Sequence, residues 1–300
     1  MEPRLPEDLE RTIFESVTDT PTLFSLLLVA RRCHIWLEKL LYRTLTISQS
    51  SWNFPLLVRT LETQPARLTW VRTLQIDPYI LPNDERVQWI LAHCPNLESL
   101  VDLSYGLTPL ALLFGMQRLR RLCVDLDTVS GLFWRYRSCA MVPFDGMLPN
   151  LTHMHILDTA RCWGRMVPLI ANGHLPALRH LTFRSYSSEY DAVEAYVPAL
   201  REILEVGGCP LESLVVYVPA GASRCAPRLK QENDVELEPK KDLVRELEKE
   251  DARFRVLEQP LGAHADPWSA AMGVEERNTS RIKWLNWPPC CILRSQDVRK

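Results

Sequence analysis

Histidine and cysteine are the residues of this 300-residue chain that could support a metal site or a nucleophile. His153 and His155 stand two positions apart, so on a β-strand their imidazoles would share one face and could ligate a transition metal. No third ligand follows at a suitable spacing, and no CxxC pair occurs among the nine cysteines. We therefore expect a solvent-facing histidine pair, reduced and mostly buried thiols, and no metal or other cofactor.

Common catalytic motifs are absent from the sequence. It contains no GxSxG, GxGxxG, P-loop or HExxH pattern. Its 11 glycines also leave few tight turns that could cradle a phosphate. An enzyme whose catalytic groups meet only in the folded chain stays open as an alternative, but the sequence favours a non-enzymatic protein.

The charge balance gives no reason to expect binding to nucleic acid or to an anionic membrane. Lysine and arginine number 35 against 37 acidic residues, a formal net charge of −2. The arginine-rich segment 118–122 alternates with leucines, as the solvated face of a strand does. The charged N-terminus does not resemble a secretory signal, and the apolar stretch near 23–30 is too short to cross a bilayer. We expect a cytoplasmic or nuclear protein.

The elements that would position such side chains recur from about residue 68 onward. Six segments begin with an apolar or X-Pro pair and continue approximately as LxxLxV; they are 70–77, 94–103, 116–126, 148–158, 175–185 and 209–218. Their anchor residues, spaced 22 to 33 positions apart, are Leu74, Leu100, Leu122, Met154, Leu181 and Leu214. Helix-like stretches separate them at 84–94, 107–116, 162–173 and 192–208. The pattern predicts an α/β fold, an irregular leucine-rich-repeat-like solenoid with parallel strands on one face and helices on the other. An ordinary α/β domain whose strands begin with leucine is the alternative.

A different pattern precedes this array. After Leu5-Pro6, an acidic first turn favours a helix N-terminus, and Leu9, Ile13 and Val17 then recur every four residues on one face. Two more helices are expected within 23–41, followed by a strand at 44–47.

Segments 5–15, 26–36 and 40–47 together resemble an F-box, particularly the divergent version common in fungal proteins. The characteristic Leu-Pro, Leu and Ile-Phe positions are Leu5, Pro6, Leu9, Ile13 and Phe14. Val29, Arg31 and Trp36 are similar to the later Val–Cys–Arg–x–Trp cluster, with Ala30 in place of the cysteine and the tryptophan three residues later. This departure from the family pattern affects the expected packing of the second and third helices. CPNLESL (94–100) is similar to repeats of F-box proteins with leucine-rich arrays.

The resemblance covers the first fifty residues; over the next two hundred it extends only to the general repeat pattern. It implies a substrate-recognition subunit of an SCF-type (cullin–RING) ubiquitin ligase, in which the F-box docks a Skp-family adaptor and the array captures a target protein. The adaptor-binding residues would be Leu5, Pro6, Leu9, Ile13, Phe14, Val29 and Trp36. The alternatives are a protein-interaction scaffold unconnected with ubiquitin and an apolar patch that merely caps the array.

Three parts follow from these patterns. They are a helical module (1–47), the array (48–262) with a charged loop and helix at 221–252, and an unassigned tail (263–300). In the array the leucines would point inward and their neighbours outward, toward a partner. Segment 94–103 is left out, because Asp102 falls where a core residue is expected. The partner-binding residues predicted in this way are Gln75, Asp77, Arg121, Asp125, His153, His155, His180, Arg184 and Tyr217.

Overall fold

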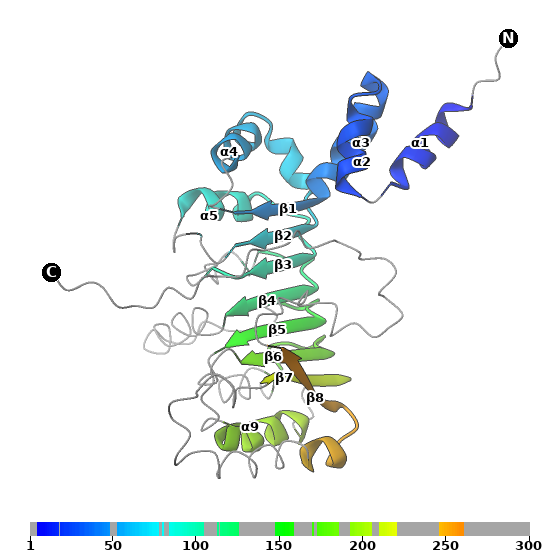
Figure 1. Ribbon diagram of the computed structural model, residues 1–300. Helices are drawn as coiled ribbons and strands as arrows, with labels where there is room; N and C mark the ends of the chain where they lie inside the picture. The colour runs from blue at the N-terminus through cyan, green and yellow to red at the C-terminus, as the bar shows by residue number, and fades with distance from the viewer. Residues whose placement is uncertain are drawn as a thin grey trace, which may run out of the picture.

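The computed structural model describes most of the sequence in separate ranges. These are residues 5–17, 19–48, 53–77, 80, 84–104, 113, 115–125, 148–158, 170, 173–185, 193–205, 210–220 and 246–260. Within them, an N-terminal group of helices stands at one end of a long stack of strands (Figure 1).

A single eight-stranded parallel sheet organises the chain. Its strands follow one another in sequence order, and each pairs in parallel with the next. The strands are β1 (Thr44–Ile47), β2 (Thr73–Ile76), β3 (Ser99–Asp102), β4 (Arg121–Asp125), β5 (His153–Asp158), β6 (His180–Ser185), β7 (Ser213–Ala220) and β8 (Phe254–Pro260). The predicted α/β class with parallel strands is therefore confirmed.

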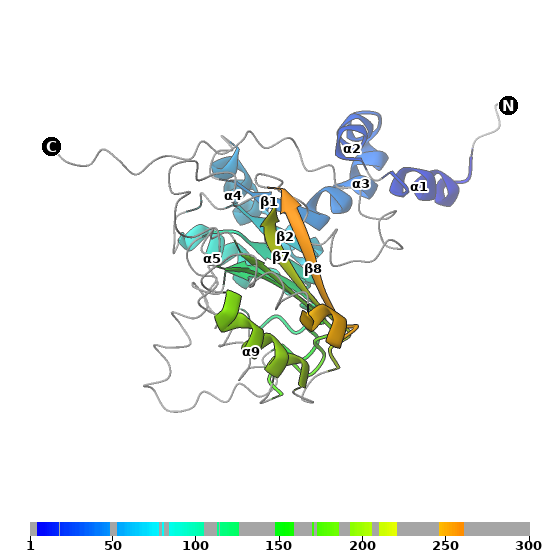
Figure 2. The ribbon, with the colours of Figure 1, turned by 60° about the horizontal axis from the view of Figure 1, so that its bottom comes forward.

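The six predicted anchor residues lie on one line across this sheet. Each is the register partner of the next, and Leu45 of β1 and Phe254 of β8 extend the line at its two ends. All are buried in the main apolar core. That core also takes side chains from helices α4 (Phe54–Thr63), α5 (Glu85–Ala92) and α9 (Val193–Glu205). Figure 2 shows α5 and α9 on the same side of the strands.

The helices only partly follow the sequence pattern. Those expected at 84–94 and 192–208 are α5 and α9, whereas most of 107–116 and 162–173 lies outside the described residues. Helix α4 and the 3₁₀ helix η1 (Pro65–Trp70) were not predicted. Phe54, Val58 and Leu61 form the buried face of α4, at a spacing that a helical pattern would have revealed.

One hydrogen-bonding arrangement repeats where the strands begin. The carbonyl of Arg72 accepts from the N–H groups of Glu98 (2.8 Å) and Ser99 (2.9 Å), one strand further along. The same double acceptance recurs at the carbonyls of Glu98, Arg120, Thr152 and Arg179. This shared backbone geometry satisfies the main-chain donors at the starts of β3, β4, β5, β6 and β7 in the same way.

Asp102 occupies a core-line position of β3, as its place in the sequence predicted. It pairs in register with Ile76 and is 4% exposed. Its Oδ1 atom accepts hydrogen bonds from the backbone N–H (3.0 Å) and the hydroxyl (2.5 Å) of Ser104. These bonds offset part of the cost of removing the carboxylate from water.

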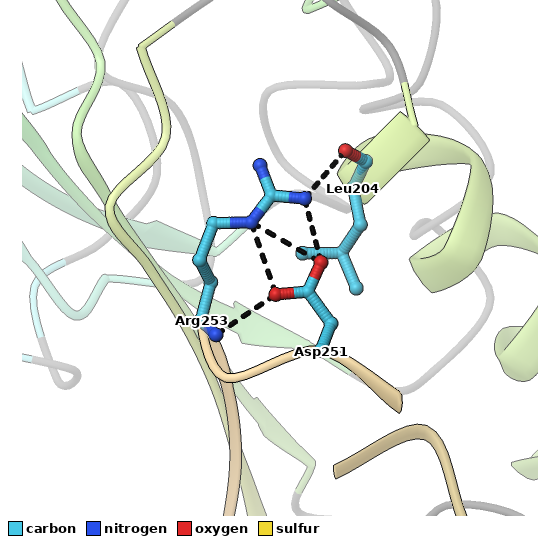
Figure 3. Close-up of polar contacts among 3 residues, drawn as sticks. All are labelled: Leu204, Asp251 and Arg253. Carbon is cyan, nitrogen blue, oxygen red and sulfur yellow. Dashed lines mark hydrogen bonds and ion pairs between the residues drawn. The ribbon is translucent and has the colours of Figure 1, made fainter. Parts of the chain in front are cut away.

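The far end of the sheet is tied to α9 by a compact polar contact (Figure 3). Arg253 donates to Asp251 through Nε (3.0 Å) and Nη2 (2.6 Å), and also through Nη2 to the carbonyl of Leu204 (2.8 Å). The predicted last strand at 254–258 is β8. Of the helix expected at 239–252, the structure describes helical residues 246–250. The helix ends two residues before the predicted end; the N–H of Asp251 still donates to the carbonyl of Leu247 at 3.0 Å, and the Asp251 carboxylate accepts from the N–H of Arg253.

Three helices form the N-terminal unit, as predicted. They are α1 (Glu7–Glu15), α2 (Thr20–Leu27) and α3 (Arg31–Arg43), and α3 runs directly into β1. Leu23, Cys33 and Leu37 form the centre of a small apolar cluster of their own, separate from the main core. In both ribbon views α1 projects away from the sheet (Figures 1 and 2).

Candidate protein-binding surfaces

Helix α1 and the residues before it present an uncovered apolar stripe. Leu5, Leu9 and Ile13 are 54%, 55% and 58% exposed, and no residue of α1 is buried. Leu9 and Ile13 stand four residues apart, so they lie along one side of the helix, and Leu5 precedes its N-cap. No part of the chain that the structure describes covers this stripe.

The remaining predicted adaptor-binding residues fall into two groups. Val29, between α2 and α3, is 66% exposed, and Pro6 is exposed at the N-cap of α1, where its carbonyl accepts from the N–H groups of Leu9 and Glu10. Phe14 and Trp36 are half-buried, and their ring centroids lie 6.2 Å apart. These two rings pack α1 against α3, so they support the exposed stripe more than they extend it.

Further exposed apolar side chains lie on α2, on α3 and between them. Phe24, Leu28 and Ile35 are 57%, 89% and 59% exposed, and none was predicted as a site residue. With Leu5, Leu9, Ile13 and Val29 they make up seven of the nine large apolar side chains that are exposed among the described residues; the other two are Leu56 and Leu257. We call these seven residues the apolar patch. Such a concentration is typical of an interaction surface.

Ion pairs lie on two of the helices that carry the patch. Glu10 of α1 pairs with Arg32 of α3 at 2.6 Å, and Arg11 pairs with Glu15 at 2.7 Å along α1. The Glu10–Arg32 pair links the two helices at the surface. An apolar centre with a polar rim is the usual anatomy of a protein interface.

The sheet face opposite the main core carries the predicted partner-binding residues. Three rows of register partners run across β4, β5 and β6: Arg121, His153 and His180; Cys123, His155 and Thr182; and Asp125, Leu157 and Arg184. Tyr217 of β7 pairs with Arg184, and Gln75 of β2 is joined to Cys123 through Val101 of β3. The register therefore places Gln75, Arg121, His153, His155, His180, Arg184 and Tyr217 on one face of the sheet, whereas Asp77 follows the end of β2 and has no register partner.

The expected exposure of this face is wrong for five of its residues. Gln75, Asp77, His155, Thr182 and Tyr217 are between 1% and 9% exposed. Arg121, His153, His180 and Arg184 are half-buried, and the side chain of Asp125 lies outside the described part of the chain.

This face also carries an apolar band of its own. Val101, Cys123 and Leu157 form a second buried cluster, against which Leu103 packs. The buried polar residues lie beside this cluster. Burial raises the pKa of the Asp77 carboxyl, against the opposing effect of a hydrogen bond with Ser48, and burial also raises the pKa of the Tyr217 phenol.

Two histidines on this face, His153 and His155, are held neutral at pH 7. Burial, together with the neighbouring His180 and Arg121, lowers the pKa of His153 to about 4. Burial and Arg184 lower the pKa of His155 to about 3. Neutral imidazoles could ligate a metal, yet the described residues include no group of three or more His, Cys, Asp or Glu side chains placed to hold an ion.

Comparison with known proteins adds no identification. No family model matches the chain, and no curated protein matches it either. Within the described ranges, no helix has both the length and the apolar character needed to span a bilayer.

Proposed function

We propose that this chain is a substrate-recognition subunit of an SCF-type ubiquitin ligase. Helices α1–α3 would dock onto a Skp-family adaptor, and the parallel sheet with its helices would hold the target protein. The observation that carries the proposal is the apolar patch, uncovered in a unit whose sequence resembles an F-box.

The physical support is that the patch gains from burial against a partner. Covering a leucine or isoleucine side chain completely is worth about 1.5–3 kcal/mol. Leu9 and Ile13 are more than half exposed, so each retains much of that gain for an adaptor. The α1 stripe has the spacing that a helix uses when it lies in an apolar groove of another protein.

The second half of the proposal concerns the sheet. Eight parallel strands in chain order, with the anchors in one register line, support an irregular leucine-rich-repeat-like solenoid. Arg121, His153, His180 and Arg184 remain half-buried on the face opposite the core, and this mixture of cationic and aromatic groups suits a protein partner.

In this role the chain performs no bond chemistry. Its contribution is proximity, because a target held beside the ligase meets the ubiquitin carrier at a high effective concentration. The neutral histidines therefore need no catalytic assignment.

Co-purification tests the proposal. The full chain is expressed with a Skp-family adaptor and with the adaptor–cullin complex, and we expect it to be recovered with both. Leu9→Asp combined with Ile13→Asp should abolish recovery, whereas Leu56→Asp is the matched control, since Leu56 is 59% exposed on α4 and outside the patch. Soluble wild-type protein that recovers neither complex would favour the scaffold unconnected with ubiquitin.

A further inference from the structure

The junction between the helical unit and the sheet is continuous along the chain. Helix α3 ends at Arg43 and β1 begins at Thr44. The carbonyl of Arg43 accepts a hydrogen bond from the N–H of Arg72, just before β2, at 2.9 Å. The last turn of α3 is thereby joined to the same region in which the later strands begin.

A shielded ion pair reinforces this junction. Arg67 of η1 pairs with Glu38 of α3, and their side chains are only 15% and 19% exposed. The Arg67 guanidinium carbon also lies 4.9 Å from the ring centroid of Tyr42. A guanidinium that pairs with a carboxylate and stacks on an aromatic ring is restrained in position and orientation more than an exposed lysine or arginine is.

Aromatic packing completes the contact. The rings of Tyr42 and Trp70 have centroids 6.2 Å apart, and the Lys39 ammonium lies 5.8 Å from the centroid of Trp70. Glu38, Lys39 and Tyr42 of α3 thus contact Arg67 and Trp70 of η1, which lie three positions apart. We call this cluster, Glu38, Lys39, Tyr42, Arg67 and Trp70, the joint.

The attachment of α1 is of another kind. Helix α1 has no buried residue, and its ion pair to α3, Glu10–Arg32, has side chains 23% and 59% exposed. Exposed pairs of this kind restrain helices weakly. Helix α1 is instead held on α3 by packing, through the rings of Phe14 and Trp36, whereas α3 is held to η1 by a shielded ion pair and by stacking.

From these contacts we infer that the joint is a rigid coupling, which fixes the orientation of α3, and of its patch residue Ile35, relative to the sheet. The coupling is a property of the isolated chain. Its consequence, that a target on the sheet stands at a set distance from the adaptor, rests on the proposed function.

Distance measurements between two spin labels test the coupling. Genetically encoded keto amino acids carry the labels, at Arg31 on α3 and at Arg118 before β4, both exposed. The otherwise unmodified full chain should give one narrow distance distribution. Glu38→Gln, Arg67→Gln and Tyr42→Ala together should broaden it at least twofold. The matched control, Arg11→Gln with Glu15→Gln, removes an exposed ion pair on α1 and should leave the width unchanged.

A second label pair, at Arg118 and Glu202 of α9, shows whether the sheet itself stays folded in the variants. Should the triple variant fail this check, the milder Trp70→Leu takes its place, with broadening expected again. A broad distribution in the wild-type chain, or a joint variant as narrow as wild type, would overturn the inference. Neither result depends on an adaptor, so failure here is distinct from failure of the proposed function.

Discussion

His153 of β5 stacks on His180 of β6, with ring centroids 4.4 Å apart and an angle of 28° between the rings. The two residues are direct register partners, and Nδ1 of His153 lies 2.8 Å from the hydroxyl of Thr152. Two stacked imidazolium ions would repel one another at this separation. The burial of His153 and this repulsion lower the pKa of His153 to about 4, which connects the stability of the fold to pH.

Stability should fall as the pH drops below about 6.5, the ordinary histidine pKa in an unfolded chain. Because burial lowers the pKa of His155 to about 3, the unfolded chain binds a proton there before the folded chain does. The free energy of unfolding therefore decreases as the pH falls from about 6.5 toward 3. Above pH 6.5 the contribution of neutral His155 is fully present. For this fully buried group the loss is about 1.4 kcal/mol per pH unit.

Urea unfolding at pH 7.5 and pH 5.5 measures this effect, with His155→Gln as the non-titrating comparison. The wild type should lose more stability between the two values than the variant does. Equal losses in the two proteins would show that His155 does not remain neutral in the fold.

The anchor line should dominate the stability of the sheet. Leu181 is fully buried in the main core, so Leu181→Ala should cost about 2–5 kcal/mol of unfolding free energy. Leu56→Ala, at an exposed position of α4, should change it by less than about 0.5 kcal/mol. Urea unfolding followed by circular dichroism checks both, and similar effects of the two changes would contradict the assignment of the core.

The contact that fixes the last strand can be weakened selectively. Arg253→Ala removes the hydrogen bonds to Asp251 and to the carbonyl of Leu204, and should cost about 1 kcal/mol. Arg253 also lowers the pKa of the Asp251 carboxyl, so the variant should return that pKa toward its ordinary value. Hydrogen exchange should accelerate in β8 while that of β2 is unchanged.

Arg201→Ala is the control for this change, since Arg201 contacts Glu250 through an exposed pair at 2.8 Å. Its effect on β8 should be small. If both variants accelerate exchange equally, the contact with Leu204 is not what holds β8 to α9.

The core could be predicted from the sequence because its constraint is local and repeated. The recurring LxxL spacing identifies the six anchor residues that form one register line across the sheet. Even the polar Asp102 at a core position is visible in this pattern. Register then follows, since side chains of a strand alternate between the two faces. The exposure of the second face does not follow, as periodicity shows which residues share a face but not what covers it. His155 illustrates this: it lies on the predicted face and is buried.

The patch was predicted only in part for a related reason. Leu9 and Ile13 stand on a helix with one apolar face, so their shared side is evident from spacing. Phe24 and Leu28 lie in an apolar stretch (23–30) interrupted only by Ser25, where spacing does not separate buried from exposed positions. A unit of about 45 residues has a small interior, and the surplus of apolar side chains stays outside.

That surplus makes its own prediction about the isolated protein. Phe24→Ser with Leu28→Ser removes two exposed apolar groups and should leave the unfolding free energy within about 0.5 kcal/mol per site. It should also reduce self-association at high concentration, as measured by light scattering. A large loss of stability would mean that these side chains contribute to folding.

Titration calorimetry of the full chain with a purified Skp-family adaptor tests the central claim most directly. We expect saturable one-to-one binding by the wild type and by Leu56→Asp, and no detectable heat for Leu9→Asp combined with Ile13→Asp, which should unfold at the wild-type temperature because both sites are exposed. Equal affinity of the folded double variant and the wild type would contradict the assignment of α1 as the docking surface.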